Sequence, residues 1–299
     1  MNAIKQLFMK SILVVVLVLI AAAALAAACA PVATLNALTP SDTHVLTQSV
    51  AYGPDARQRA DIYQPRTAAP ANGFPTVVFF YGGARNRGDR ADYRFVGEAL
   101  ASRGILTILA DYRLYPQVRY PEFLRDSAAA LAWAREQAPR LGGDTKRLFV
   151  MGHSAGAYNA AMLALDARWL GAVNLSPAIL AGWIGLAGPY DFLPMTNPDA
   201  QPVFFHPAYP KDSQPIAYAS ATAPATFLAA AQTDELVNPQ RNTRQMAQKL
   251  AAAGVAVTLR SYDKPDHGTL IGAFARPLRW LAPVLDDVGA FVRDQAPTR

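Results

Sequence analysis

The chain has a single cysteine, Cys29, among its 299 residues. Without a second cysteine it cannot form an internal disulfide, so the fold must be held together without one. The chain also lacks any run of five or more lysines and arginines, and its net charge of +6 is spread along the sequence. Scattered charge of this size is typical of a solvated surface and does not indicate nucleic acid as a partner.

The sequence contains no internal repeat, and charged residues make up only 17% of it. Hydrophobic residues make up 52%. This composition and length are typical of a globular protein with one large domain.

Residues 1–28 differ from the rest. Lys5 and Lys10 precede an uncharged stretch, Ser11 to Ala28, that ends in small residues. A basic start followed by an apolar stretch is typical of a secretory signal. The stretch is also about as long as a membrane-spanning helix needs to be, so retention as an anchor stays open. We predict a signal or anchor segment over residues 1–28.

Cys29 directly follows this segment, in Ala26-Ala27-Ala28-Cys29. This resembles a bacterial lipobox, in which the cysteine is lipidated and becomes the mature N-terminus. Three outcomes stay open: a lipoprotein lipidated at Cys29, a soluble exported protein and an uncleaved anchor. We expect an exported bacterial protein, periplasmic or held on a membrane through its N-terminus. Residues 29–47, which include Pro, Thr, Ala and Ser and show no periodicity, are predicted to be a linker.

From residue 48 to 299 the sequence predicts an α/β domain. Two short apolar segments around Gly53-Pro54-Asp55 are typical of a hairpin at the edge of a sheet. Beyond Pro75, apolar runs alternate with helical patterns, which predicts a mostly parallel sheet with helices on both faces. The predicted strands are 76–81, 105–110, 147–151, 183–187, 226–231 and 255–262, and the predicted helices are 91–102, 121–140, 155–165, 238–253 and 283–293. Sites in such sheets lie at the carboxyl ends of the strands.

The strand at 147–151 leads into Gly152-His153-Ser154-Ala155-Gly156. This is a G-x-S-x-G pattern, in which a sharp turn from strand to helix presents a serine hydroxyl. The two glycines leave room for the backbone to double back. Ser154 is therefore the candidate nucleophile. His153, the variable residue of the pattern, is expected to point away from the work of the serine.

A serine hydroxyl needs a base within hydrogen-bond reach, and a carboxylate must orient that base. His267 lies in a loop directly after the last strand and is the candidate base, whereas His44 lies in the linker and His206 in a proline-rich segment. Asp234 follows the strand at 226–231 and is the candidate acid, with Glu235 as the alternative. Elsewhere, Asp191 is interpreted as a structural turn carboxylate, and Asp266 as too close to His267 in sequence to face its ring.

The oxyanion of a tetrahedral intermediate needs hydrogen-bond donors. One is the backbone amide of Ala155, directly after the serine. Further donors are expected in the loop after the strand at 76–81, where Gly82-Gly83 lets backbone amides point into the site. Gly83 and Ala84 are the candidates there.

The segment from Pro194 to Pro224 interrupts the alternation of strands and helices. It is rich in proline and contains Phe204-Phe205-His206. We interpret it as a partial lid over the site, with Phe204 and Phe205 as candidate substrate-binding residues; the alternative is an ordinary surface connection.

Several of these motifs together resemble the α/β-hydrolase superfamily, and within it the carboxylesterases related to hormone-sensitive lipase, the arylformamidases and the feruloyl esterases. The motifs are Tyr81-Gly82-Gly83, Asp111-Tyr112-Arg113-Leu114, Gly152–Gly156, Asp234 and His267. The resemblance implies an α/β-hydrolase fold, with an eight-stranded, mostly parallel sheet whose second strand is antiparallel, no large cap domain, and neither cofactor nor metal. It implies Ser154 as nucleophile, Asp234 as acid, His267 as base, and the amides of Gly83, Ala84 and Ala155 as oxyanion hole.

The chain departs from the family pattern at two positions. Tyr81 replaces the usual histidine before the glycines, and Ala84 replaces a third glycine or a bulky residue. Both changes keep the backbone amides and alter the side chains that shape the acyl pocket, so Tyr81 is a further candidate substrate-binding residue.

The resulting expectation is a serine carboxylesterase that hydrolyses small or medium acyl esters through an acyl-enzyme intermediate, with a small-molecule ester as its substrate and its oligomeric state left open. An amide hydrolase, arylformamidase-like or peptidase-like, is the alternative on the same three residues. The chain has no propeller-sized N-terminal domain, which argues against a peptidase. The intact set of serine, aspartate and histidine argues against a catalytically silent binding module.

Overall fold

The computed structural model describes residues 5, 8–9, 12–13 and 30–298. Within these residues one sheet of eight strands has the order β1-β2-β4-β3-β5-β6-β7-β8. Strands β3 to β8 are parallel, β2 is antiparallel to β4, and β1 is antiparallel to β2. The predicted fold class is confirmed, including the antiparallel second strand. The strands are β1 (His44–Ala51), β2 (Arg59–Pro65), β3 (Phe74–Phe80), β4 (Leu106–Ala110), β5 (Gly143–His153), β6 (Leu180–Leu186), β7 (Thr226–Ala231) and β8 (Val257–Tyr262).

Burial differs between the middle and the edges of this sheet. Every residue of β3, β4, β6 and β7 is buried, because helices cover both faces and leave no side of these strands to solvent. The edge strands β1 and β8 are partly exposed. This is why the central strands appear in the sequence as continuous apolar runs and the edge strands do not.

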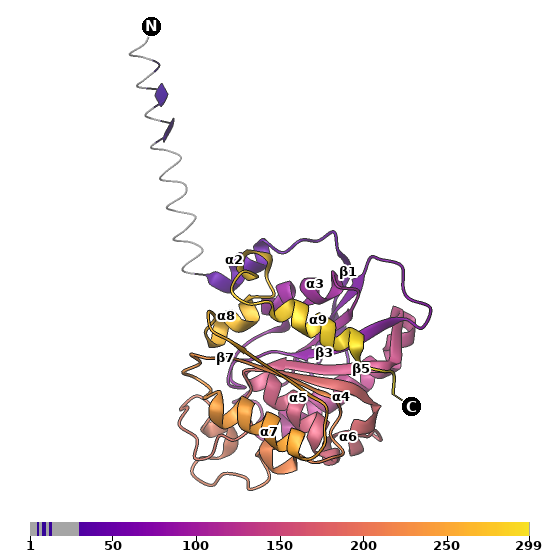
Figure 1. Cartoon of the computed structure of the whole chain (residues 1–299), viewed down its shortest axis with the longest axis vertical. Coiled ribbons are helices and arrows are strands. Elements are labelled where there is room, and N and C mark those ends of the chain that lie inside the picture. Colours follow the sequence, from indigo (N-terminus) through magenta and orange to yellow (C-terminus); the bar gives the residue numbers. More distant parts are fainter. Residues whose placement is uncertain (1–4, 6–7, 10–11, 14–29, 299) are drawn as a thin grey trace.

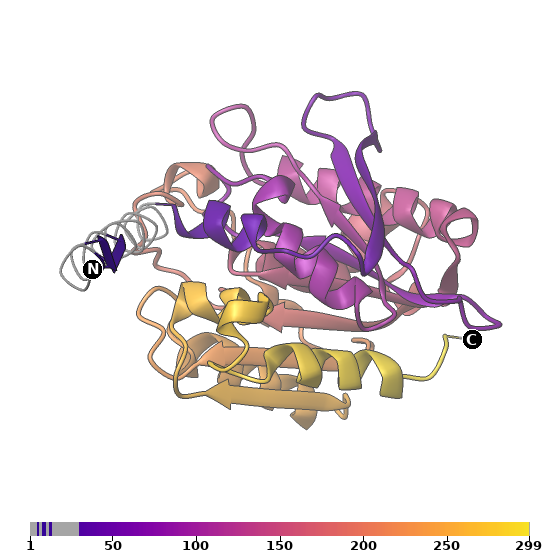
Figure 2. The same ribbon diagram turned by 90° about the horizontal axis from the view of Figure 1, so that it is seen from above.

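The helices form two layers, one on each face of the sheet (Figures 1 and 2). On one face lie α3 (Arg94–Ala101) and α9 (Val284–Asp294), and on the other lie α4 (Glu122–Gln137), α5 (Ala155–Leu165), α6 (Ala167–Gly171) and α7 (Gln245–Ala252). All residues of α5 are buried, since this helix lies between the sheet and its helical neighbours. The shorter elements are α2 (Pro31–Ala37), α8 (His267–Gly272), the 3-10 turns 90–93, 138–141, 177–179, 202–204, 215–218 and 276–278, and a π-helical turn at 240–244.

The segment predicted as a linker, residues 29–47, is partly folded. It contains α2 and the start of β1. Leu35 of α2 and Leu46 of β1 pack against the core, and the Asn36 side chain donates a hydrogen bond to the backbone oxygen of Ala91 (2.8 Å). The prediction of a linker is therefore corrected for residues 31–37 and 44–47. The predicted edge hairpin is present as β1 and β2.

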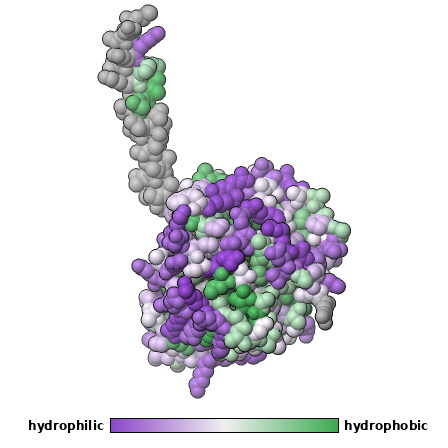
Figure 3. All heavy atoms as spheres, viewed as in Figure 1, coloured by the Kyte–Doolittle hydropathy of each residue, from purple (hydrophilic) through white to green (hydrophobic). Residues whose placement is uncertain are grey.

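The N-terminal predictions concern residues that the structure mostly does not describe. Cys29 lies outside the described residues, as does most of segment 1–28. Of the helices that are described, none combines the length and the apolar character that a membrane crossing requires. The face in Figure 3 is mostly hydrophilic with a smaller hydrophobic group near its centre.

Between β6 and β7, residues 187–225 carry only two short 3-10 turns among the described elements. This insertion extends from the carboxyl end of β6, on the same side of the sheet as the turns that follow β3, β5, β7 and β8. It therefore lies beside the residues that the sequence assigns to a catalytic site.

Candidate active site

Ser154 occupies the turn between β5 and α5. Its backbone angles are φ 53° and ψ −120°, a conformation that residues other than glycine rarely adopt and that recurs at functional sites. The Ser154 amide donates to the backbone oxygen of Leu186 in β6 (2.9 Å). A Cβ on Gly156 would lie 2.0 Å from the backbone oxygen of Phe80, so only glycine lets α5 approach β3 this closely. The turn thereby holds the hydroxyl at the carboxyl edge of the sheet.

His267 is the first residue of α8, and its ring lies between Ser154 and Asp234. Its Nε2 is 2.9 Å from the Ser154 Oγ, and its Nδ1 is 2.7 Å from the Asp234 Oδ2. An ionised carboxylate only accepts hydrogen bonds, so Nδ1 carries the proton and Nε2 has a free lone pair. That nitrogen is therefore placed to accept the proton of the serine hydroxyl.

Asp234 follows β7, and its side chain is fully buried. Its Oδ1 accepts hydrogen bonds from the backbone amides of Leu236 (2.9 Å) and Val237 (2.8 Å). With Oδ2 directed at His267, both carboxylate oxygens have partners and the group is fixed in orientation. The structure thus brings together three residues that are far apart in the chain, at the distances a proton relay requires.

Two of the three competing carboxylates, Asp266 and Asp191, have other partners. Asp266 caps α8 and accepts from the Thr269 amide and hydroxyl, both at 2.7 Å. These hydrogen bonds hold the pKa of Asp266 below its usual value. Asp191 pairs with Arg241 at 3.0 Å. Glu235 lines the cavity beside the site.

Gly83, Ala84 and Ala155 line the same cavity as Ser154 and His267. Gly83, Ala84 and Arg85 all have positive φ angles, of 114°, 51° and 66°. Ala155 is the first residue of α5, where backbone amides have no partner within the helix and the helix dipole favours negative charge. The three residues predicted to bind an oxyanion are therefore adjacent to the serine.

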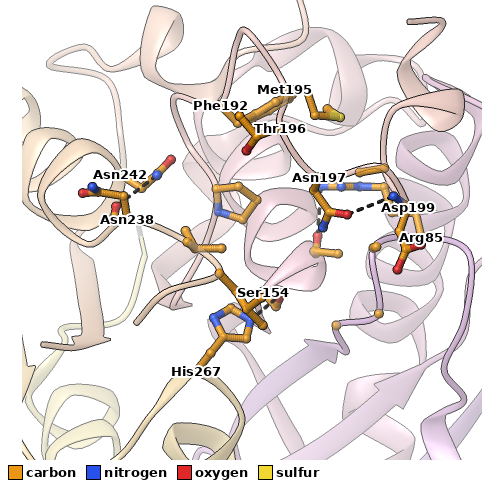
Figure 4. Close-up of a pocket in the computed structure, with 18 of the residues that line it drawn as sticks. Arg85, Ser154, Phe192, Met195, Thr196, Asn197, Asp199, Asn238, Asn242 and His267 are labelled. Atoms are coloured by element: carbon orange, nitrogen blue, oxygen red, sulfur yellow. Dashed lines mark hydrogen bonds between the residues drawn. The ribbon is translucent and has the colours of Figure 1, made fainter. Parts of the chain in front are cut away.

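The cavity has a volume of about 660 Å³. Figure 4 shows Ser154 and His267 at one end of it, with Phe192, Met195 and Thr196 on the opposite wall. Asn238 and Asn197 lie on opposite sides. Most residues from 191 to 200 line this wall and belong to the insertion after β6, so the beginning of the segment interpreted as a partial lid borders the cavity.

The three candidate substrate-binding aromatics do not line this cavity. Phe204 is fully buried, and its ring packs against those of Tyr120, Phe123, Tyr158 and Phe192 at 5.1 to 6.0 Å. This prediction is corrected, because an aromatic cluster in a proline-rich segment does not reveal from sequence whether it faces a ligand or the core.

Tyr81 and Phe205 are likewise directed elsewhere. Tyr81 is buried and stacks on Tyr112 with ring centroids 4.9 Å apart, and its hydroxyl accepts from Arg57 (2.7 Å). Phe205 is partly exposed, and its ring lies 5.3 Å from the guanidinium of Arg119. Tyr81 therefore packs in the core next to the glycine turn, and Phe205 contacts Arg119 at the surface.

His153 was expected to point away from the site, and the structure corrects this. Its Nε2 lies 2.9 Å from the backbone oxygen of His267, and the two imidazole rings are 5.0 Å apart. Burial, with a smaller contribution from His267, lowers the pKa of His153 to about 3. The ring is therefore neutral near neutral pH. The contact joins residues more than a hundred positions apart, so no local sequence signal marks it.

Arg85 is a further residue of the site that the sequence does not mark. Its guanidinium lies over the rings of Tyr158 (4.2 Å) and Phe204 (4.9 Å), and it donates a long hydrogen bond to the backbone oxygen of Ala155 (3.4 Å). Burial lowers its pKa. Arg85 lies two residues after Gly83 and belongs to no recognised motif, so only the paired glycines mark this turn in the sequence.

Over the described residues, no group of three or more His, Cys, Asp or Glu side chains is arranged to hold a metal ion.

Comparison with known proteins places these features in a family. A family model described as BD-FAE matches residues 60–250. The chain is similar to a probable isoprenylcysteine alpha-carbonyl methylesterase, ICME, of Oryza sativa subsp. japonica, at 33% identity over 148 residues, which is 48% of this chain and 35% of that protein. It is similar to Esterase LipC of Mycobacterium tuberculosis, at 30% identity over 227 residues, 70% of this chain and 56% of that protein.

The fold is also similar to that of solved esterase structures. A structure titled bacterial heroin esterase superposes with a TM-score of 0.71 at 25% identity, over 90% of this chain and 91% of the other. A hyperthermophilic esterase from Pyrobaculum calidifontis superposes with a TM-score of 0.70 at 21% identity, over 88% and 90% of the two chains; at that identity the likeness shows the fold. The chain spans 35% and 56% of the length of the two curated relatives above.

Proposed function

Because the chain belongs to the BD-FAE family of α/β-hydrolases, we propose that it is a serine carboxylesterase. The observation that carries the proposal is the relay at the sheet edge, in which His267 lies 2.9 Å from the Ser154 hydroxyl and 2.7 Å from the Asp234 carboxylate. A serine with these partners, in an elbow turn that opens into a cavity, is equipped for acyl transfer.

The reaction follows from these positions. The Ser154 Oγ attacks the ester carbonyl while His267 Nε2 takes its proton, and Asp234 stabilises the imidazolium. The amides of Gly83, Ala84 and Ala155 receive the negative charge on the carbonyl oxygen. Collapse of the intermediate breaks the bond to the alkoxy group, which leaves as an alcohol with the proton from His267. Water, deprotonated by His267, then attacks the acyl-enzyme; the bond to Ser154 Oγ breaks, the acid is released, and His267 returns the proton to Ser154 Oγ.

The proposed substrates are esters of small or medium acyl groups. A cavity of about 660 Å³ is in the range of small-molecule sites. Its wall combines apolar side chains such as Phe192 and Met195 with polar ones such as Asn197 and Asn238. Such a mixture fits an ester whose acyl and alcohol parts differ in polarity.

The first test is substitution of the nucleophile. Ser154→Ala should lower kcat for a p-nitrophenyl acetate-type ester by at least about 10⁴-fold, as removal of a relay member does in related enzymes. Fluorophosphonate should label the wild-type protein and leave Ser154→Ala unlabelled. Ser176→Ala, which alters an exposed serine at a 3-10 turn, should be labelled fully. Turnover by Ser154→Ala at the wild-type rate would place the nucleophile elsewhere.

A substrate panel then separates ester from amide hydrolysis. Simple esters, acetylated sugars and formyl-anilides would be compared by kcat/KM on the wild-type protein. The proposal expects esters to be preferred, and a preference for the formyl-anilides would instead support an amide hydrolase on the same three residues.

We further propose that the protein is exported and held on a membrane through lipid on Cys29. This rests on the basic start, the apolar stretch Ser11 to Ala28 and the cysteine that directly follows it.

A further inference from the structure

His153 makes a contact that the reaction described above does not use. Its side chain is buried, and its Nε2 lies 2.9 Å from the backbone oxygen of His267. A carbonyl oxygen only accepts hydrogen bonds, so Nε2 carries the proton and donates it. His153 ends β5 immediately before the nucleophile, and His267 begins α8. The bond therefore ties the backbone of the base to the turn that carries the serine.

The contacts among His153, Ser154 and His267 form a closed loop. One side is the 2.9 Å contact between the His267 Nε2 and the Ser154 Oγ, and another is the 2.9 Å bond from the His153 Nε2 to the His267 oxygen. The planar peptide bond between residues 153 and 154 closes it. A shift of α8 relative to the elbow would disturb both contacts at once. Holding the His267 carbonyl thus limits how far its ring can drift from the hydroxyl.

The opposite side of the His153 ring shows that packing alone does not account for a histidine here. Its Nδ1 is buried and has no hydrogen-bond partner among the described residues. It faces the glycine turn, where a Cβ on Gly82 would lie 3.3 Å from Nδ1 and 2.9 Å from the Ser154 Cβ. A purely hydrocarbon ring would fill this space without burying an unpartnered acceptor. What histidine adds over such a ring is the donor at Nε2.

We propose that His153 is a positioning residue that keeps His267 within reach of Ser154. It acts through the His267 backbone, touches no reacting atom and transfers no proton. The inference rests on the proposed esterase function and adds a fourth residue to it. Since His267 moves a proton in both acylation and deacylation, loss of the bond should slow both steps and leave substrate binding unchanged.

The test compares two substitutions of similar size. His153→Phe keeps the ring and removes the donor, whereas His153→Gln supplies an amide that can donate to the same oxygen. We expect kcat of His153→Phe to fall about 10- to 100-fold, the scale of a small misplacement of a catalytic group, with KM within about twofold of wild type. His153→Gln should recover most of the loss. The rate of fluorophosphonate labelling at Ser154 should follow kcat.

The matched control is His44→Phe. His44 is also buried and contacts Tyr63 ring to ring at 5.0 Å, but it lies in β1 away from the cavity. This variant should keep wild-type kcat even if its melting temperature falls. A wild-type kcat in His153→Phe would overturn the inference, as would equal losses in folded His153→Phe and His153→Gln.

The inference can also be tested on the unsubstituted protein, which covers the case in which His153→Phe does not fold. In histidine-labelled protein, ¹⁵N NMR near neutral pH should show His153 as the Nε2–H tautomer with slow proton exchange; the Nδ1–H tautomer would overturn the inference. Wild-type turnover and labelling are measured first. If the wild-type protein shows neither turnover nor labelling, the esterase proposal itself is refuted. If it shows both but substitution of His153 leaves kcat unchanged, only the positioning role is refuted.

Discussion

At the scale of single residues, His153 links the geometry of the site to the pH dependence of folding. Its pKa is about 3 in the folded protein against a usual value of 6.5. Between these two values the unfolded chain binds a proton that the folded protein does not. Stability therefore falls as the pH drops below about 6.5, and each pH unit removes up to about 1.4 kcal/mol until about pH 3.

This predicts a measurable difference between wild type and His153→Gln. From pH 8 to pH 5 the wild-type protein should lose about 2 kcal/mol more free energy of unfolding than the variant, which has no titrating group at this position. Urea titrations at both pH values measure the loss. His44, whose pKa burial also lowers, is present in both proteins, so its contribution cancels. Equal losses in the two proteins would show that His153 is already protonated, or able to ionise, in the folded state.

At the scale of structural elements, the turn after β3 depends on a buried arginine. The Arg85 guanidinium lies over the rings of Phe123, Tyr158 and Phe204, and its Nε is buried with no hydrogen-bond partner in the described part of the chain. The turn is thus fastened to α4, α5 and the insertion after β6 by one side chain. Cation–π contacts of this kind offset part of the cost of burying the charge.

We predict that the shape of this side chain matters more to stability than its charge. Arg85→Ala should lower the free energy of unfolding by about 3 kcal/mol, because it leaves a cavity among three aromatic rings. Arg85→Met fills most of that space without a buried charge and should stay within about 1 kcal/mol of wild type. Urea unfolding measures both.

The control for this pair is Arg87→Met. Arg87 lies two residues further along and forms an exposed ion pair with Asp199 at 2.7 Å, a type of contact that contributes little to stability. Its free energy of unfolding should change by less than about 1 kcal/mol. If Arg85→Met instead loses as much as Arg85→Ala, the charge over the rings is itself the main stabilising feature.

The same elements show what the sequence could and could not predict. The strand at 226–231 was predicted at its observed bounds because its residues are buried on both faces and form one apolar run. The edge strand β1 mixes buried and exposed residues, so the sequence does not mark its first half, residues 44–47, as a strand. The approach of residues 154, 234 and 267 could be predicted from the G-x-S-x-G pattern, the order of serine, aspartate and histidine in the chain, and their positions after predicted strands. Phe204 and His153 were misjudged because their surroundings come from remote parts of the chain.

At the scale of the whole molecule, the proposed attachment to a membrane can be tested by one substitution. Cys29→Ser should move the protein from the membrane fraction to the soluble fraction after cell lysis, because it removes the only site for the proposed lipid. Ser154→Ala, which keeps Cys29, should fractionate as wild type. Unchanged fractionation of Cys29→Ser would show that lipid is not required and leave the apolar stretch as the anchor.

The position of α2 determines how far the folded body could lie from such an attachment. This helix begins at Pro31 and is secured to the body of the protein through Leu35 and Asn36. Residue 29 precedes Pro31 by two residues, and two residues span at most about 7 Å. A fatty acyl group on residue 29 would then be joined to the folded body by that short length of chain. With so short a connection, the folded domain would stay close to the lipid headgroups and could adopt few orientations relative to the membrane. Esters near the bilayer surface would meet the cavity more often than those dissolved further away.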